Sequence, residues 1–226
     1  MKSIIIATSL SLAFLAGCIT MPDPVPDEYL VNKTAEDNKA LDRLAAAIIA
    51  KNHELKSSKD KLAGSEDKLQ VERGRLDILK NEKDLLISKQ KQFELEKDQA
   101  KIDENTKALA EKDGQIEVQT SRVEYAAAYS DNARAERDVA ETELSVLVAD
   151  LNYQKSKIAK AYLLKQEPAG KEGETKTSNP FKPGPDKYDE QYEKYLNKQR
   201  ETLADKKNEQ EKSAVRLKIA ENNLKK

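Results

Sequence analysis

Few residues in this 226-residue chain have the types and spacing that catalysis, metal binding or covalent modification requires. Cys18 is the only cysteine, so no intramolecular disulfide can form. His53 is the only histidine, which argues against catalytic triads, histidine metal sites and histidine proton shuttles. We expect His53 on a solvated helix face.

Acidic residues are plentiful, but they form no recognisable reaction centre. Paired-acid catalysis needs a pocket that desolvates one carboxyl group, and nearly all the acids lie in segments expected to be helical. The GxxxxGK[ST], GxGxxG and GxSxG motifs are missing. Clusters such as Asp103-Glu104 lack the glycine-containing loop of a calcium site. We therefore expect no enzyme activity, no cofactor and no metal site.

The residues before Cys18 follow the pattern of a secretory signal. A positive start, Met1-Lys2-Ser3, precedes an apolar run from Ile4 to Leu15. That run is shorter than the about 20 residues of a membrane span. The following tetrapeptide, Leu15-Ala16-Gly17-Cys18, resembles the lipobox of bacterial lipoproteins. An ordinary signal peptide that happens to contain a cysteine is the alternative.

The resemblance implies how the N-terminus is processed and where the chain is held. Residues 1–17 would be a signal peptide removed before Cys18, and acyl chains such as palmitate would be attached to Cys18. Residue 19 is isoleucine, whereas an aspartate there often signals inner-membrane retention in this family. The resemblance thus implies the outer membrane, with the chain facing the periplasm.

The composition is typical of long helices rather than of a globular core. Charged residues make up 36% of the chain, against about 25% in ordinary domains, and there is no tryptophan. The formal net charge of −1 shows no basic surplus for binding nucleic acid.

Proline divides the chain into segments. No proline occurs between Asp27 and Glu167, as uninterrupted helix would require. We expect a lipidated, extended proline-rich tether over 18–33 and a long helical region over 34–166 that begins with a capping box at Thr34 to Asp37. A flexible Pro/Gly-rich loop at 167–185 and a C-terminal helix over 186–226, capped by Asp186, would follow.

Apolar residues recur every seven positions, which indicates a coiled coil. The first run comprises Leu41, Ile48, Leu55, Leu62, Leu69 and Leu76, and the second Leu95, Ile102, Leu109, Ile116 and Val123. In the last helix the spacing continues through Leu196, Leu203, Leu217 and Leu224. The partner half of the stripe is weak up to Val123. After Leu44 it continues with polar residues, which are Lys51, Ser58, Ser65, Glu72, Asp98, Asn105, Lys112 and Gln119. From Val123 onward small alanines broaden the stripe, and there we expect the closest packing.

Two all-α architectures agree with these patterns. In the preferred one, residues 34–166 form a single rod, and the C-terminal helix folds back antiparallel on 123–164. In the alternative, a turn near Gly114 produces a three-helix antiparallel bundle. The heptad register continues from Leu109 to Ile116 across Gly114, which favours the rod. Tyr188, Tyr192 and Tyr195 are expected to anchor the terminal helix, although a stacking or cell-wall-binding role is the alternative for them.

The general plan of a lipidated cysteine, a heptad helix and a terminal lysine resembles the murein lipoprotein of enteric bacteria. That resemblance implies attachment of the Lys226 amine to peptidoglycan, but this chain is longer and carries a proline-rich break. Otherwise Lys226 is only a favourable charge at a helix C-terminus. We expect a membrane-anchored coiled-coil lipoprotein with a structural, tethering or scaffolding role in the cell envelope.

The expected partners are the membrane, through the N-terminal lipid, then peptidoglycan or an envelope protein, and further copies of the chain through the coiled coil. The alternative function is a surface-exposed or envelope-machine-associated binding module, an adhesin or accessory subunit, that engages a partner helix.

Overall fold

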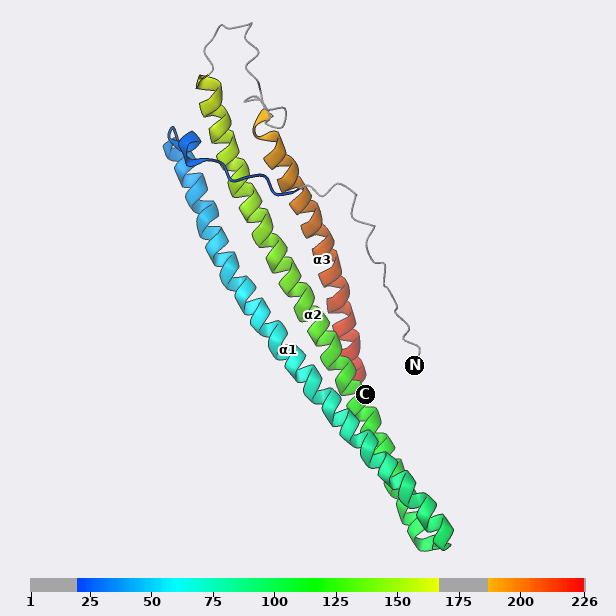
Figure 1. Cartoon of the computed structure of the whole chain (residues 1–226). Helices are drawn as coiled ribbons and strands as arrows, with labels where there is room; N and C mark the ends of the chain where they lie inside the picture. Colours follow the sequence, from blue (N-terminus) through cyan, green and yellow to red (C-terminus); the bar gives the residue numbers. More distant parts are fainter. Residues whose placement is uncertain (1–19, 167–186, 226) are drawn as a thin grey trace, which may run out of the picture. The chain divides into compact units, whose positions relative to one another are not determined.

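The computed structural model describes residues 20–166 and 187–225, and over these residues the chain is all-α (Figure 1). A short 3-10 helix, η1 (Asp27–Leu30), precedes three long helices, which are α1 (Ala35–Glu96), α2 (Gln99–Gln166) and α3 (Glu190–Leu224). The all-α expectation is confirmed. None of the helices described is long and apolar enough to cross a membrane.

Several sequence-based expectations fall outside the described residues. They are the signal peptide over 1–17, Cys18, the loop over 167–185, the capping role of Asp186, and Lys226.

The expectation of one continuous helix over 34–166 is wrong, because the chain turns at Lys97. This residue adopts a left-handed conformation with φ 57°. Its N–H donates to Glu94 O at 3.2 Å, and the N–H of Asp98 donates to Phe93 O at 3.2 Å, which is the Schellman pattern of a helix end. The Asp98 side chain then accepts a bond from Lys101 N at 3.2 Å and so caps α2. The turn of the alternative architecture is misplaced as well, since Gly114 lies inside α2.

The other predicted helix ends agree more closely. Thr34 and Asp37 form a reciprocal capping box: Asp37 N donates to Thr34 Oγ1 at 3.1 Å, and Thr34 N donates to Asp37 Oδ2 at 2.9 Å. The helix α2 ends at Gln166, two residues before the proline at 168. The last helix begins at Glu190, and Asp189 O accepts bonds from the N–H groups of Tyr192 and Glu193.

Contacts group the residues into two units. Unit 1 comprises the described residues of Met1–Asp42 and Ala149–Gln199, and unit 2 comprises those of Arg43–Val148 and Arg200–Lys226. Unit 1 contains η1, the start of α1, the end of α2 and the start of α3. Unit 2 contains the remainder of the three helices.

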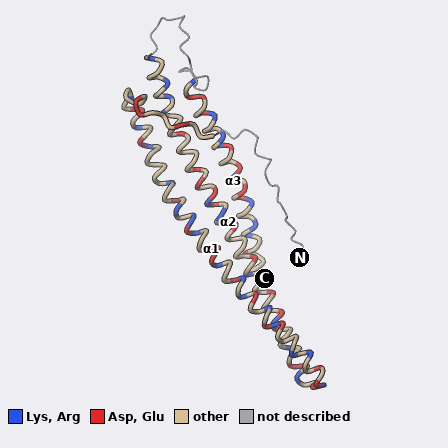
Figure 2. The backbone as a smooth tube through the Cα atoms, viewed as in Figure 1, with Lys and Arg blue, Asp and Glu red and all other residues tan. Residues whose placement is uncertain are grey.

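In unit 2, α1 and α2 form an antiparallel pair that we call the hairpin arm, residues 43–96 and 99–148. Salt bridges fix the direction, because the partners of Lys51, Glu66 and Lys83 in α1 are Glu143, Arg134 and Asp113 in α2. α3 runs antiparallel to α2, with Lys207 bonded to Glu143 and Ser213 to Asn132. The expected fold-back of the C-terminal helix is thus present. Charges of both signs are intermixed along all three helices (Figure 2).

The heptad residues of α1 and α2 form the contact of the hairpin arm, which we call the inner seam. Leu55 and Leu62 are each 8% exposed. The alanines at 126, 133 and 140 are buried, which confirms the expected close packing beyond Val123. Leu95 is an exception to the predicted second run: it is 86% exposed and lies on the side of α1 turned away from the half-buried Leu86 and Phe93.

Candidate functional site

Residues 20–30 pack against the helices of unit 1. We call residues 20–30 the strap. Pro26 has φ −59° and ψ 137°, the extended polyproline geometry expected here. However, Val25 and Leu30 are buried in one cluster with Ala159 of α2 and Tyr192 of α3. The described part of the predicted tether is therefore not a free spacer, because two aliphatic side chains of the strap gain burial against the helices.

Tyrosines hold the strap at both of its ends. Tyr192 Oη donates to Asp23 O at 2.7 Å, and Tyr29 stacks on Tyr162 with ring centroids 5.9 Å apart. The ring of Tyr188 contacts those of Tyr29 and Tyr192. Its centroid lies 6.1 Å from that of Tyr29 and 5.8 Å from that of Tyr192. Figure 1 shows the strap running from beside α3 towards the start of α1. The strap thus contacts the end of α2 and the start of α3, and it leads directly into α1.

The tyrosine contacts agree with the expected anchoring of the terminal helix by Tyr188 and Tyr192. Burial raises the pKa of both phenols, so both are neutral donors at physiological pH. Tyr192 is only 2% exposed, and its ring therefore presents no open face on which a ligand could stack. Tyr195 is half-buried.

Removal of the Tyr192 hydroxyl is expected to loosen the strap. Tyr192→Phe keeps the ring packing but loses the bond to Asp23 O, so the free energy of unfolding should fall by about 1 kcal/mol. Limited proteolysis should then cut residues 20–26 faster than in the parent chain. The control is Tyr195→Phe, a half-buried tyrosine on the same helix, which should leave both the unfolding midpoint and the cleavage rate unchanged. Equal cleavage rates of the parent and Tyr192→Phe chains would contradict the role of the Tyr192 hydroxyl in holding the strap.

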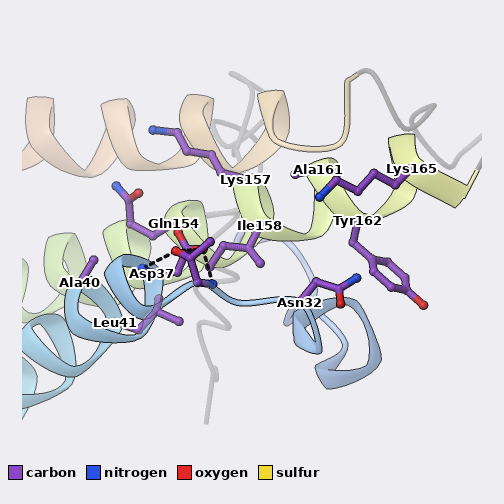
Figure 3. Close-up of a pocket in the computed structure, with 11 residues that line it drawn as sticks. Asn32, Asp37, Ala40, Leu41, Gln154, Lys157, Ile158, Ala161, Tyr162 and Lys165 are labelled. Atoms are coloured by element: carbon purple, nitrogen blue, oxygen red, sulfur yellow. Dashed lines mark hydrogen bonds between the residues drawn. The ribbon is translucent and has the colours of Figure 1, made fainter.

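A cavity of about 240 Å³ lies in unit 1 between the start of α1 and the end of α2 (Figure 3). Its walls include Leu41, Ile158, Tyr162 and Lys165. The capping box occupies one side, and the hydrogen bond from the Thr34 backbone holds the pKa of Asp37 below its usual value. Lys157, another lining residue, lies 4.2 Å from the ring centroid of Tyr153.

This cavity holds no recognisable set of reactive groups. Its lining includes neither a histidine nor a cysteine, and the polar groups of the capping box are engaged with one another. Within residues 20–166 and 187–225, no group of three or more His, Cys, Asp or Glu side chains is placed to hold a metal ion.

The polar half of the heptad stripe forms hydrogen-bonded layers inside the inner seam. Gln119 Nε2 donates to Glu72 O at 3.0 Å and to Glu72 Oε2 at 2.7 Å, although Gln119 is only 4% exposed. Asn105 Nδ2 donates to Leu86 O at 3.0 Å and to Gln90 Oε1 at 2.7 Å. None of the buried side-chain nitrogen and oxygen atoms in the described part of the chain lacks a partner. Such paired layers set the register of the two helices.

Glu143 connects the three helices of unit 2. Its carboxylate accepts bonds from Lys51 Nζ at 2.9 Å and Lys207 Nζ at 3.0 Å. Burial alone would raise the pKa of Glu143, but the bonds from the two lysines hold it below the usual value. The same contact raises the pKa of Lys51.

Stability should depend on pH through Glu143. Because its pKa is lower in the folded chain, its contribution is present above the unfolded pKa of 4.5 and is lost as the pH falls through the folded pKa. Glu143→Gln should therefore lower the melting temperature at about pH 7, and the difference from the parent chain should shrink towards about pH 3. Thermal melts across this range provide the measurement. A difference that grew on acidification would contradict the assigned pKa direction.

The structure thus defines a class of protein, a helical hairpin with a third antiparallel helix and a docked N-terminal strap. Comparison of the chain with protein-family models, curated proteins and solved structures finds no match. The sequence predicted roles for Cys18 and Lys226, which lie outside the described residues, but it gave no prediction of the docking of the strap. Val25 and Leu30, two aliphatic residues within a proline-rich segment, were the available signal.

Proposed function

We propose that this chain is a lipid-anchored scaffold of the bacterial cell envelope, attached through acylated Cys18 to the outer membrane and facing the periplasm. The observation that carries the proposal is the docking of the strap directly after the lipobox-like sequence. Only residue 19 separates Cys18 from Thr20, the first described residue. At up to about 3.6 Å per residue, the Cα atom of the lipid-bearing Cys18 would lie within about 7 Å of the Cα atom of Thr20.

Docking gives the lipid a mechanical role. A lipid on an undocked tether would hold the chain near the membrane without coupling it to the helices. A strap whose Val25 and Leu30 are buried transmits a pull on the anchor to α2 and α3. Asp23, bonded to Tyr192, is the first strap residue at which that load reaches a helix.

The hairpin arm supports a spacing or scaffolding role. Its α1 portion, residues 43–96, contains 54 residues, which gives about 80 Å of helix at 1.5 Å per residue. The paired polar layers and the salt bridges hold the two helices in one register over that length. A long arm with a charged surface offers area for contacts with envelope partners rather than an enclosed reaction chamber.

Envelope fractionation combined with protease shaving tests the proposal. The full-length chain should appear in the outer-membrane fraction, and protease added to intact cells should leave it uncut. After the outer membrane is permeabilised, the hairpin arm should be digested. Cleavage in intact cells would contradict the periplasmic placement and favour the surface-exposed binding module. Recovery in the soluble fraction would contradict the anchor itself.

A further inference from the structure

α1 carries a second line of residues at helical 3-and-4 spacing, on the side turned away from the inner seam. We call it the outer seam. Its eight positions contain no charged residue, although charged residues make up 36% of the chain. They are Val71, Gly74, Ile78, Asn81, Leu85, Ser88, Gln92 and Leu95. A helix with two such stripes is typical of one that packs against two different neighbours.

Over residues 20–166 and 187–225, no segment covers the outer seam. Val71 is 52% exposed, Ile78 59%, Leu85 64% and Leu95 86%. A Cβ added to Gly74 would meet no atom within 4 Å. A mid-helix glycine weakens the helix, and no contact with another described residue accounts for Gly74. By contrast, the inner-seam residues Leu62 and Gln119 of the same hairpin arm are buried.

We propose that the outer seam pairs in parallel with the outer seam of a second copy of this chain. In this arrangement each aliphatic residue faces its own counterpart, so Val71, Ile78, Leu85 and Leu95 each form an apolar layer. Asn81 faces Asn81 of the second copy, so the two side-chain amides can hydrogen-bond to each other when the helices are in this register. Gly74 lets the helices approach closely between the layers of Val71 and Ile78.

Charges beside the outer seam complement this pairing. In a parallel coiled coil, residues five positions apart face each other across the contact. Asp84 then meets Lys89 of the second copy, and Lys91 meets Glu96 of the second copy. Asp77 would face Glu82 of the second copy, but Lys112 already neutralises Glu82 in its own chain at 2.7 Å. Two attractive contacts and one screened repulsion therefore occur on each side of the dimer.

An antiparallel pairing is disfavoured by the apolar layers. The register that brings Arg75 opposite Glu96 of the second copy would place Ile78 opposite Ser88 and Leu85 opposite Asn81. Burial of an aliphatic side chain against another contributes more to stability than a solvent-exposed ion pair. The layers thus decide the orientation. This inference deepens the scaffold function by naming a partner, and it does not depend on acylation.

Light scattering on residues 18–226 carrying Cys18→Ser tests the pairing without the lipid. The chain should be a dimer, and Ile78→Asp should raise the dimer dissociation constant at least about tenfold, because it places two carboxylates in an apolar layer. The matched control is Ile49→Asp, which changes an isoleucine of the same helix that is 61% exposed but lies off the outer seam. It should leave the dimer intact. A monomeric parent chain, or equal effects of the two substitutions, would overturn the proposal.

Crosslinking tests the orientation. In the same Cys18→Ser background, Leu85→Cys creates a single thiol at a layer of the outer seam. A parallel dimer brings the two thiols together, so a mild oxidant should join them as a disulfide, with each thiol losing one proton and one electron to the oxidant. Ile49→Cys should remain mostly uncrosslinked. Failure of Leu85→Cys to crosslink in a chain that light scattering shows to be dimeric would overturn the parallel arrangement.

Discussion

Replacing Cys18 with serine is expected to move the chain from the membrane fraction to the soluble fraction almost completely. The serine cannot carry a thioether-linked lipid, and no described helix can span a membrane. Each buried methylene of an acyl chain contributes about 0.8 kcal/mol to membrane binding, so the loss of two or three chains removes the attachment. Fractionation after a carbonate wash, followed by immunoblotting, measures the partition.

Thr20→Ser is the matched control, because it changes a hydroxyl residue two positions further along and leaves the lipobox-like sequence intact. It should fractionate with the parent chain. A Cys18→Ser chain that stayed in the washed membranes would mean that protein contacts, rather than a lipid, hold the chain there.

Leu196→Ala is expected to cause the largest loss of stability among single substitutions in unit 1. Leu196 is 1% exposed and is among the largest fully buried side chains described. It lies one turn after Tyr192, so its truncation leaves a cavity beside the residue that holds the strap. Substitutions of this kind lower the free energy of unfolding by about 2–5 kcal/mol. Urea unfolding followed by circular dichroism measures the change.

The control for this substitution is Ile219→Ala, a residue of the same helix that is 55% exposed. It should cost less than about 1 kcal/mol, because its side chain is already in contact with water. Similar unfolding midpoints for Leu196→Ala and Ile219→Ala would contradict the assigned packing of α3.

Much of the fold followed from local signals in the sequence. Thr34 and Asp37 predicted the start of α1, because side-chain caps act over one turn. The proline at 168 predicted the end of α2, and the alanines beyond Val123 predicted the closest packing. Each of these features depends on steric effects or hydrogen bonds between residues close together in the chain.

The turn at Lys97 could not be read in the same way. Helix ends of this type usually carry glycine, because a side chain disfavours positive φ. Lys97 adopts that conformation without glycine. The antiparallel contacts of α1 with α2, such as Glu72 with Gln119, offset the local cost, and they join residues far apart in the sequence. Gly114, which looked like a turn residue, is accommodated inside α2 instead.

Polar residues in the heptad stripe obscured which helices pair with each other. Gln119 and Asn105 appeared to weaken the heptad stripe, yet they pair across the inner seam with Glu72 and Gln90. The strap was similarly hidden, because its prolines indicated an extended spacer while Val25 and Leu30 supplied the apolar contact. Both features require knowledge of which distant segments meet.

The mass of the N-terminal peptide of the chain, extracted from bacterial membranes, shows whether Cys18 is acylated. We expect a peptide that begins at Cys18 and carries the added mass of its acyl chains. A peptide that retained residues 1–17, or an unmodified Cys18 in membrane-bound chain, would contradict the lipid anchor.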